Sequence, residues 1–74
     1  MMSNAFHTNT EVEWEWGNGT GSGYVREIFR ERVTRTLQGH EVTRKGCKDN
    51  PAYLVEQNDG AKVLKLHSEL SSVN

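Results

Sequence analysis

Aromatic residues offer the clearest binding chemistry in this sequence. Rings of Trp, Tyr and Phe attract cations through their π faces, at ~0.5–2 kcal/mol per ring, so converging rings beside a carboxylate would hold a cationic side chain. We predict Trp16, Tyr24 and Tyr53 as ligand-binding residues, because each lies at the end of a predicted strand beside a turn or loop. Filling the core is the simpler interpretation for Trp14 and competes for Trp16, since both share a strand face with Val12.

Nucleic acid is the second ligand class that the residue types suggest. Residues 24–48 carry seven basic and three acidic side chains, a net charge of +4, whereas residues 1–23 have a net charge of −3. The total of −1 disfavours strong non-specific binding to phosphates. A solvated strand face with mutually neutralised charges is the simpler interpretation of the basic segment. The candidate nucleic-acid contacts are Arg26, Arg30, Arg32 and Lys48.

Catalytic and metal-binding patterns are missing from the sequence. His7, His40 and His67 are widely separated, so we predict no metal site and no cofactor. Cys47 is the only cysteine, which excludes an internal disulfide, and no partner for nucleophilic catalysis is placed beside it. The glycine-rich residues 17–23 have neither the Lys-Ser/Thr of a Walker loop nor the G-x-G-x-x-G spacing of a dinucleotide site. We therefore expect a protein that is not an enzyme.

The length of the chain allows one small domain. The sequence has 74 residues, of which 34% are hydrophobic. A chain of this size buries only about 60% of its unfolded surface, which leaves no material for a large enzyme cleft. The longest uncharged apolar run, at 52–55, has four residues, and the N-terminus lacks the pattern of a signal peptide. These features predict a cytoplasmic protein without a membrane span, and we expect a monomer.

Strict alternation marks the first strand. In residues 11–16, Val12, Trp14 and Trp16 share one face and three glutamates the other. The following residues 17–23 contain four glycines and are predicted to form a flexible turn. The next segment, 24–37, is ambiguous, because its apolar residues fit helical spacing while its β-branched residues and the preceding turn favour a long strand with a bulge.

Short strands separated by turns fill the rest of the chain. Residues 40–44 are predicted to pair back on 33–37, and the Asp-Gly step at 59–60 predicts a hairpin between strands at 53–57 and 61–66. A helical or 3₁₀ turn is expected at 67–70. Five short strands suit a small, strongly bent antiparallel barrel. Its predicted core is Val12, Trp14, Val25, Ile28, Val33, Val42, Leu54, Val63, Leu64, Leu66 and Leu70.

Five stretches of the sequence resemble the hypervirulence-associated Tudor-domain family. They are EWEWG at 13–17, TGSG at 20–23, EVTRKG at 41–46, DNPAYLVEQ at 49–57 and DGAKVLKLHSEL at 59–70. The resemblance implies an all-β, five-stranded Src-homology-3-like (Tudor) barrel over residues 11–70 with a short C-terminal helical turn. The family is found largely in bacteria and fungi, so the resemblance is consistent with the bacterial source that we expect, and it favours strand for residues 24–37. Residues 1–10 would then be a disordered tail, and 71–74 a C-terminal tail.

The resemblance carries a fold but no established activity, so the function stays a hypothesis. The first hypothesis is an interaction module that binds a protein segment or a modified side chain at the barrel rim, between residues 17–23 and 49–53. The alternative is nucleic-acid binding through the basic segment 26–48. A third, an enzyme assembled from four small barrels as in one type of dihydrofolate reductase, lacks a match to that enzyme's substrate-binding strand.

Overall fold

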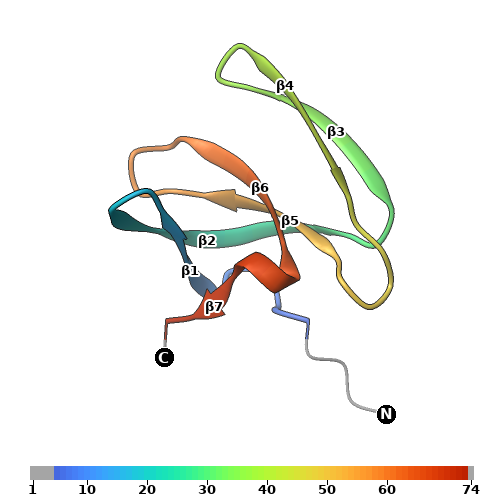
Figure 1. The fold of residues 1–74 in the computed structure, drawn as a ribbon, viewed down its shortest axis with the longest axis horizontal. Helices are drawn as coiled ribbons and strands as arrows, with labels where there is room; N and C mark the ends of the chain where they lie inside the picture. The colour runs from blue at the N-terminus through green and yellow to red at the C-terminus, as the bar shows by residue number, and fades with distance from the viewer. Residues whose placement is uncertain (1–4, 74) are drawn as a thin grey trace.

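Antiparallel β-strands make up most of the computed structural model, which describes residues 5–73 (Figure 1). One sheet has the strand order β6-β5-β2-β1-β7, and β3 pairs with β4 in a separate ladder. The predicted all-β class and the short turn after the last long strand are therefore confirmed. The elements are β1 (Glu11–Trp16), β2 (Gly19–Phe29), β3 (Arg32–Leu37), β4 (His40–Lys45), β5 (Ala52–Glu56), β6 (Lys62–Leu66), the 3₁₀ turn η1 (His67–Glu69) and β7 (Ser71–Ser72).

A closed five-stranded barrel is not what these strands form. Within the described residues, the two ladders do not join into one continuous cylinder of hydrogen bonds. The β3–β4 hairpin instead stands over one face of the larger sheet, as Figure 1 shows. The β5–β6 hairpin predicted from Asp59-Gly60 is present, and Gly60 has the positive φ of +89° that such a turn requires.

The glycine-rich segment is mostly strand rather than the flexible turn predicted for it. Only residues 17–18 turn, and β2 begins at Gly19. Trp14 pairs directly with Gly21, and Trp16 with Gly19, so each ring lies on the same face as a glycine across the ladder. A Cβ atom added at Gly21 would lie 2.7 Å from the Trp14 ring. Gly19 and Gly21, which lie on this face of β2, therefore make room for the indole rings.

Residues 24–37 form parts of two strands, and a bulge explains their helix-like spacing. The register between β2 and β5 shifts between Val25 and Glu27, so Val25 pairs with Val55 while Ile28 pairs with Tyr53. The extra residue places Val25 and Ile28 on one face although they are three positions apart. The apolar spacing that resembled a helix is thus the mark of a bulged strand.

The strand β5 is covered on both faces, and the core is divided in two. Tyr53 and Val55 belong to one cluster, whereas Ala52 and Leu54 belong to the other. The predicted core residues are all found in or against these clusters, but they do not form a single plug. The first cluster contains Val12, Trp14, Val25, Tyr53, Val55 and Leu70, and the second contains Val33, Leu37, Ala52, Leu54 and Leu64.

Both ends of the described chain are held against the sheet, in contrast to the tails expected there. The N–H of Asn9 donates to the Val25 carbonyl at 2.6 Å, and Phe6 packs against the first cluster. At the other end, Ser71–Ser72 forms β7 beside β1. The small core explains this arrangement, because the end segments cover apolar surface that the sheet alone leaves open. The disorder predicted for residues 1–4 and the last position of the C-terminal tail lie outside the described residues.

Candidate functional site

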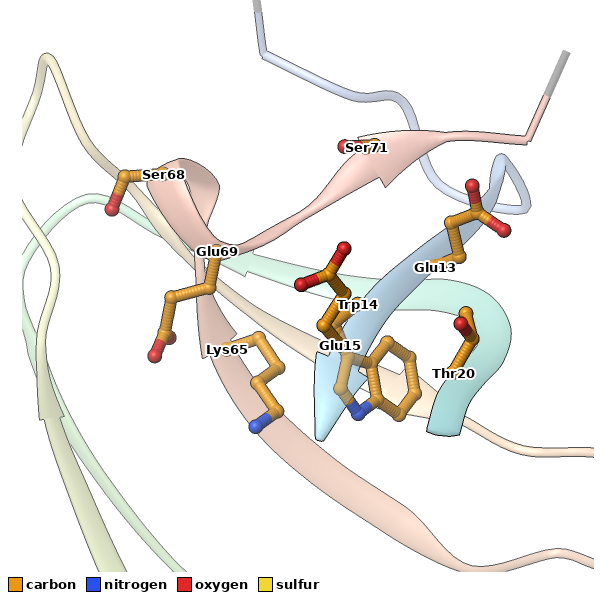
Figure 2. A pocket seen from close by; sticks show the side chains of 8 residues that line it. All are labelled: Glu13, Trp14, Glu15, Thr20, Lys65, Ser68, Glu69 and Ser71. Atoms are coloured by element: carbon orange, nitrogen blue, oxygen red, sulfur yellow. The ribbon is translucent and has the colours of Figure 1, made fainter. Parts of the chain in front are cut away.

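A cleft lies between β1 and the β6–η1 segment. It has a volume of about 400 Å³, and Figure 2 shows side chains from the two segments lying around it. The cleft lies where β1 extends past Glu13, the last of its residues that pairs with β7. Its lining residues are Glu13, Trp14, Glu15, Thr20, Lys65, Ser68, Glu69 and Ser71.

Three carboxylates and one amine set the charge of this cleft. Glu13 and Glu15 come from β1, Glu69 from η1 and Lys65 from β6. The Lys65 Nζ atom lies 5.8 Å from the centre of the Trp14 ring, within cation–π range. Trp14 is itself buried, at 6% exposure. The cleft therefore presents negative charge beside the Trp14 indole, and the amine of Lys65 lies near the same ring.

Glu69 is fixed by a network that also covers the edge of β6. Its Oε1 atom accepts hydrogen bonds from the Leu66 N–H at 2.8 Å and from Arg44 Nη2 at 2.6 Å. Arg44 Nη1 also donates to the Leu64 carbonyl at 3.4 Å. Burial by itself raises the pKa of Glu69, but the Leu66 N–H and the charges of Arg44 and Lys65 together lower it. The Glu69 carboxylate is thus held in its charged form.

The three aromatic residues predicted as a ligand site are not brought together. Trp16 is 62% exposed at the turn end of β1. Tyr24 pairs with Glu11 at the opposite end of the β1–β2 ladder. Because Trp16 shares a face with Trp14, while Tyr24 lies on the face of the glutamates, the Trp16 and Tyr24 rings do not converge.

Tyr53 is a core residue rather than an exposed rim residue. Its side chain is fully buried, and its hydroxyl oxygen accepts a hydrogen bond from the Phe6 N–H at 2.9 Å. The same hydroxyl lies 3.0 Å from His67 Nδ1. Burial raises the pKa of the Tyr53 hydroxyl, against smaller opposing contributions from the Phe6 hydrogen bond and Arg30. Sequence position beside a loop suggested exposure, but both hydrogen-bond partners of this phenol come from distant segments.

The rim proposed between residues 17–23 and 49–53 is not a single surface. The β1–β2 turn lies next to Gly19, where β2 begins, whereas Ala52 pairs with Phe29, where β2 ends. Figure 1 accordingly shows the β1–β2 turn and the loop before β5 on opposite sides of the molecule. The bulge and the length of β2 separate the two segments that the sequence suggested as neighbours.

Arg26 is separated from the other predicted nucleic-acid contacts by its own interactions. It lies at the bulge of β2, where its Nε atom donates to Glu56 at 3.0 Å and its Nη1 atom to Asn9 at 2.6 Å. Its guanidinium also lies 5.6 Å from the centre of the Tyr24 ring. Arg26 is thus occupied within the fold, and the π face of Tyr24 already has a cation beside it.

The remaining predicted contacts lie around the start of the β3–β4 hairpin. Arg32 pairs directly with Lys45 across this ladder, and both are exposed. Arg30 and Lys48 are exposed and adjoin the pair in sequence. The chain is tightly packed here, since a Cβ atom added at Gly46 would lie 2.6 Å from the Phe29 carbonyl oxygen. We name the residues Arg30, Arg32, Lys45 and Lys48 the basic corner.

Sequence reasoning missed the acidic cleft. The alternation of residues 11–16 correctly placed Glu13 and Glu15 on the face opposite Trp14, but it indicated only a solvated strand surface. Glu69 and Lys65 join them through a turn whose course is fixed by distant contacts. The one available signal was the run of three glutamates in a segment with no basic residue.

Comparison with family models identifies the chain. The model described as the TUDOR domain of hypervirulence-associated proteins matches residues 10–70. The chain belongs to this Tudor-domain family. Comparisons with curated proteins and with solved structures found no match. Membership in this family is consistent with the all-β architecture, and Tudor domains are in general small, non-enzymatic binding modules.

None of the helical segments in residues 5–73 is long and apolar enough to cross a membrane. The same part of the chain contains no group of three or more His, Cys, Asp or Glu side chains arranged to hold a metal ion.

Proposed function

We propose that this Tudor domain binds a cationic segment of a partner protein in the acidic cleft. The observation that supports the proposal is the position of Glu13, Glu15 and Glu69 around a hollow of about 400 Å³ beside Trp14. A Lys or Arg side chain entering the cleft would meet carboxylates, and it could exchange with Lys65 near the indole. Thr20, Ser68 and Ser71 add hydroxyl groups that hydrogen-bond to a polar ligand.

The aromatic candidates are unequally available for this function. Tyr24 has Arg26 beside its ring, and Tyr53 is buried with its hydroxyl hydrogen-bonded. Trp16 is exposed and directly follows Glu15 in β1. Trp16 is therefore the predicted aromatic residue that stays accessible to a ligand, although it lies outside the lining of the cleft and on the strand face opposite Glu15.

The test is titration with a capped peptide that carries one Arg, matched with the same peptide carrying Gln. Backbone amide shifts should change at Glu13, Glu15 and Lys65 with the Arg peptide only. The double variant Glu13→Gln/Glu15→Gln should weaken binding roughly 3- to 10-fold, the range for two partly exposed ion pairs. Glu41→Gln on β4 is the matched control. Equal binding of the Arg and Gln peptides would contradict the proposal.

Nucleic-acid binding at the basic corner is the second candidate function. Like charges placed directly opposite on a ladder destabilise it, so the pairing of Arg32 with Lys45 favours an anion that neutralises both. A phosphate backbone provides such anions, and its binding weakens as salt rises. Fluorescence anisotropy with a labelled single-stranded oligonucleotide should show binding at low salt that Arg32→Gln/Lys45→Gln removes. No binding at the lowest salt would exclude this function.

A further inference from the structure

We propose that the partner segment binds as an added β-strand along the outer edge of β1, on the part of β1 that follows Glu13 and does not pair with β7. This inference rests on the proposed function and specifies how the cleft recognises its ligand. The strand β7 pairs with β1 only at Val12 and Glu13, although β1 continues to Trp16. In residues 5–73, no strand pairs with the remaining part of that edge.

The direction of the backbone groups supports this assignment. The Val73 N–H donates to the Glu11 carbonyl at 3.3 Å, so the polar backbone groups of Glu11 point toward β7. In a strand the N–H and C=O of one residue point to the same edge, and alternate residues share that edge. Glu13 and Glu15 therefore point the same way as Glu11. At Glu15, this edge faces the cleft instead of another strand.

The course of the chain after β6 explains why the position opposite Glu15 is open. An unbroken antiparallel strand that pairs Ser71 with Glu13 would place residue 69 opposite Glu15. Glu69 belongs instead to η1, and its carboxylate is bound to Arg44 and the Leu66 N–H. Leu70 is buried between η1 and β7. The turn therefore takes the chain away from β1 and leaves the cleft in its place.

On the other side of the cleft, side chains form hydrogen bonds to the outer edge of β6. On β6, Arg44 donates to the Leu64 carbonyl, and Glu69 accepts from the Leu66 N–H. The molecule's own side chains thus satisfy two of the outward backbone groups of β6, the Leu64 carbonyl and the Leu66 N–H. Covering an edge is one of the ways in which proteins blunt it, and no strand of residues 5–73 covers the outer edge of β1 at Glu15.

The negative charge of the cleft indicates which kind of peptide would bind there. On an added strand, the residue directly opposite Glu15 would have its side chain beside the Glu15 carboxylate. Glu13 and Glu69 also line the cleft. The complementary ligand is an extended protein segment with Lys or Arg opposite Glu15, held by main-chain hydrogen bonds to Glu15 and passing toward Trp16. This mode is β-strand addition, in which the backbone supplies affinity and one side chain supplies selectivity.

The test uses a capped peptide, acetyl-Gly-Val-Ser-Arg-Val-Ser-Gly-amide, and two N-methylated forms. Backbone methylation at Arg removes the N–H that would pair with Glu15, whereas methylation at the following Val modifies an N–H that points away. We expect the unmodified peptide and the Val-methylated form to bind alike and the Arg-methylated form at least 10-fold more weakly. Amide hydrogen exchange of Glu15 should slow at least 10-fold on saturation.

The outcomes separate this inference from the function on which it rests. Equal binding of both methylated forms, with unchanged exchange at Glu15, would overturn strand addition while leaving peptide binding in the cleft intact. Equal binding when Arg is replaced by Gln would overturn the proposed function itself. If sedimentation shows a dimer in which Glu15 is already protected without peptide, a second copy occupies the edge and the inference is wrong.

Discussion

The acidic cleft and the basic corner collect charge in opposite ways. The cleft is lined by Glu13, Glu15 and Glu69, and the Glu69 carboxylate is fixed by Arg44 and the Leu66 N–H. At the basic corner, Arg32 and Lys45 stand side by side on an exposed ladder. The cleft combines glutamates with a stretch of the β1 edge that no strand of residues 5–73 pairs with, whereas the corner presents basic side chains on the face of a two-stranded ladder. This difference suits an extended peptide at the first region and phosphate groups at the second.

The largest expected effect comes from filling the space beneath Trp14. Gly21→Ala would place a Cβ atom 2.7 Å from the indole, so the ring must move and the wall of the cleft with it. We expect a loss of about 1–3 kcal/mol in the free energy of unfolding, as for other overpacked sites, measured by urea denaturation. Binding at the cleft should weaken, and binding at the basic corner should not.

Gly19→Ala is the matched control for this change. It lies on the same strand face, but its Cβ atom would be 3.7 Å from the nearest atom of Trp16, an ordinary contact. Equal destabilisation by Gly19→Ala and Gly21→Ala would show that general strand preference, rather than the fit of Trp14, explains the result.

A smaller effect is expected at Glu69 and depends on pH. The pKa of Glu69 is lowered in the folded state below its ordinary value of 4.5, so its contribution to stability is present above that value and is lost as pH falls through the folded pKa. Glu69→Gln should reduce stability at pH 7 by less than about 1 kcal/mol, because the pair with Arg44 is partly exposed. The difference between variant and parent should shrink as the pH is lowered below 4.5.

Glu41→Gln on β4 controls for the general effect of removing a carboxylate. If it gave the same pH dependence as Glu69→Gln, the network of Glu69, Arg44 and Leu66 would have no special part in acid sensitivity. Thermal melts of the three proteins between neutral and acidic pH provide the measurement.

The smallest expected effect is a gain in stability at the basic corner. Lys45→Glu places a carboxylate opposite Arg32 and converts a repulsive pair into an attractive one. An opposite-charge pair on a ladder contributes about 0.2–1 kcal/mol, so the midpoint of urea denaturation should rise slightly. Oligonucleotide binding should fall at the same time. A variant that lost stability would show that Arg32 and Lys45 do not repel each other in the folded protein.

Local patterns predicted the elements of this fold better than they predicted its sites. Alternation identified β1, and the Asp59-Gly60 step located the β5–β6 hairpin. The bulge at Arg26 was foreseen only as one of two possibilities, because its apolar spacing is also that of a helix. Such local features are determined by neighbouring residues, which a sequence displays directly.

The candidate site depends on contacts that the sequence does not display. Tyr53 is buried because Phe6 and His67 lie against it, 47 and 14 positions away. Glu69 joins Glu13 and Glu15 because η1 turns the chain away from β1. Neither arrangement has a local signature. The strand count and the family resemblance both indicated the all-β class, and neither supplied a ligand.

The two-sided burial of β5 couples the halves of the molecule. Tyr53 and Val55 belong to one cluster, and Ala52 and Leu54 belong to the other. Detachment of β5 from the sheet would therefore disrupt both clusters. Partial unfolding that spared one half would expose apolar surface on the other face of β5. The domain should therefore melt in a single cooperative transition, with the slowest amide exchange in β5. Ligand bound at the distant edge of β1 would then protect the whole chain.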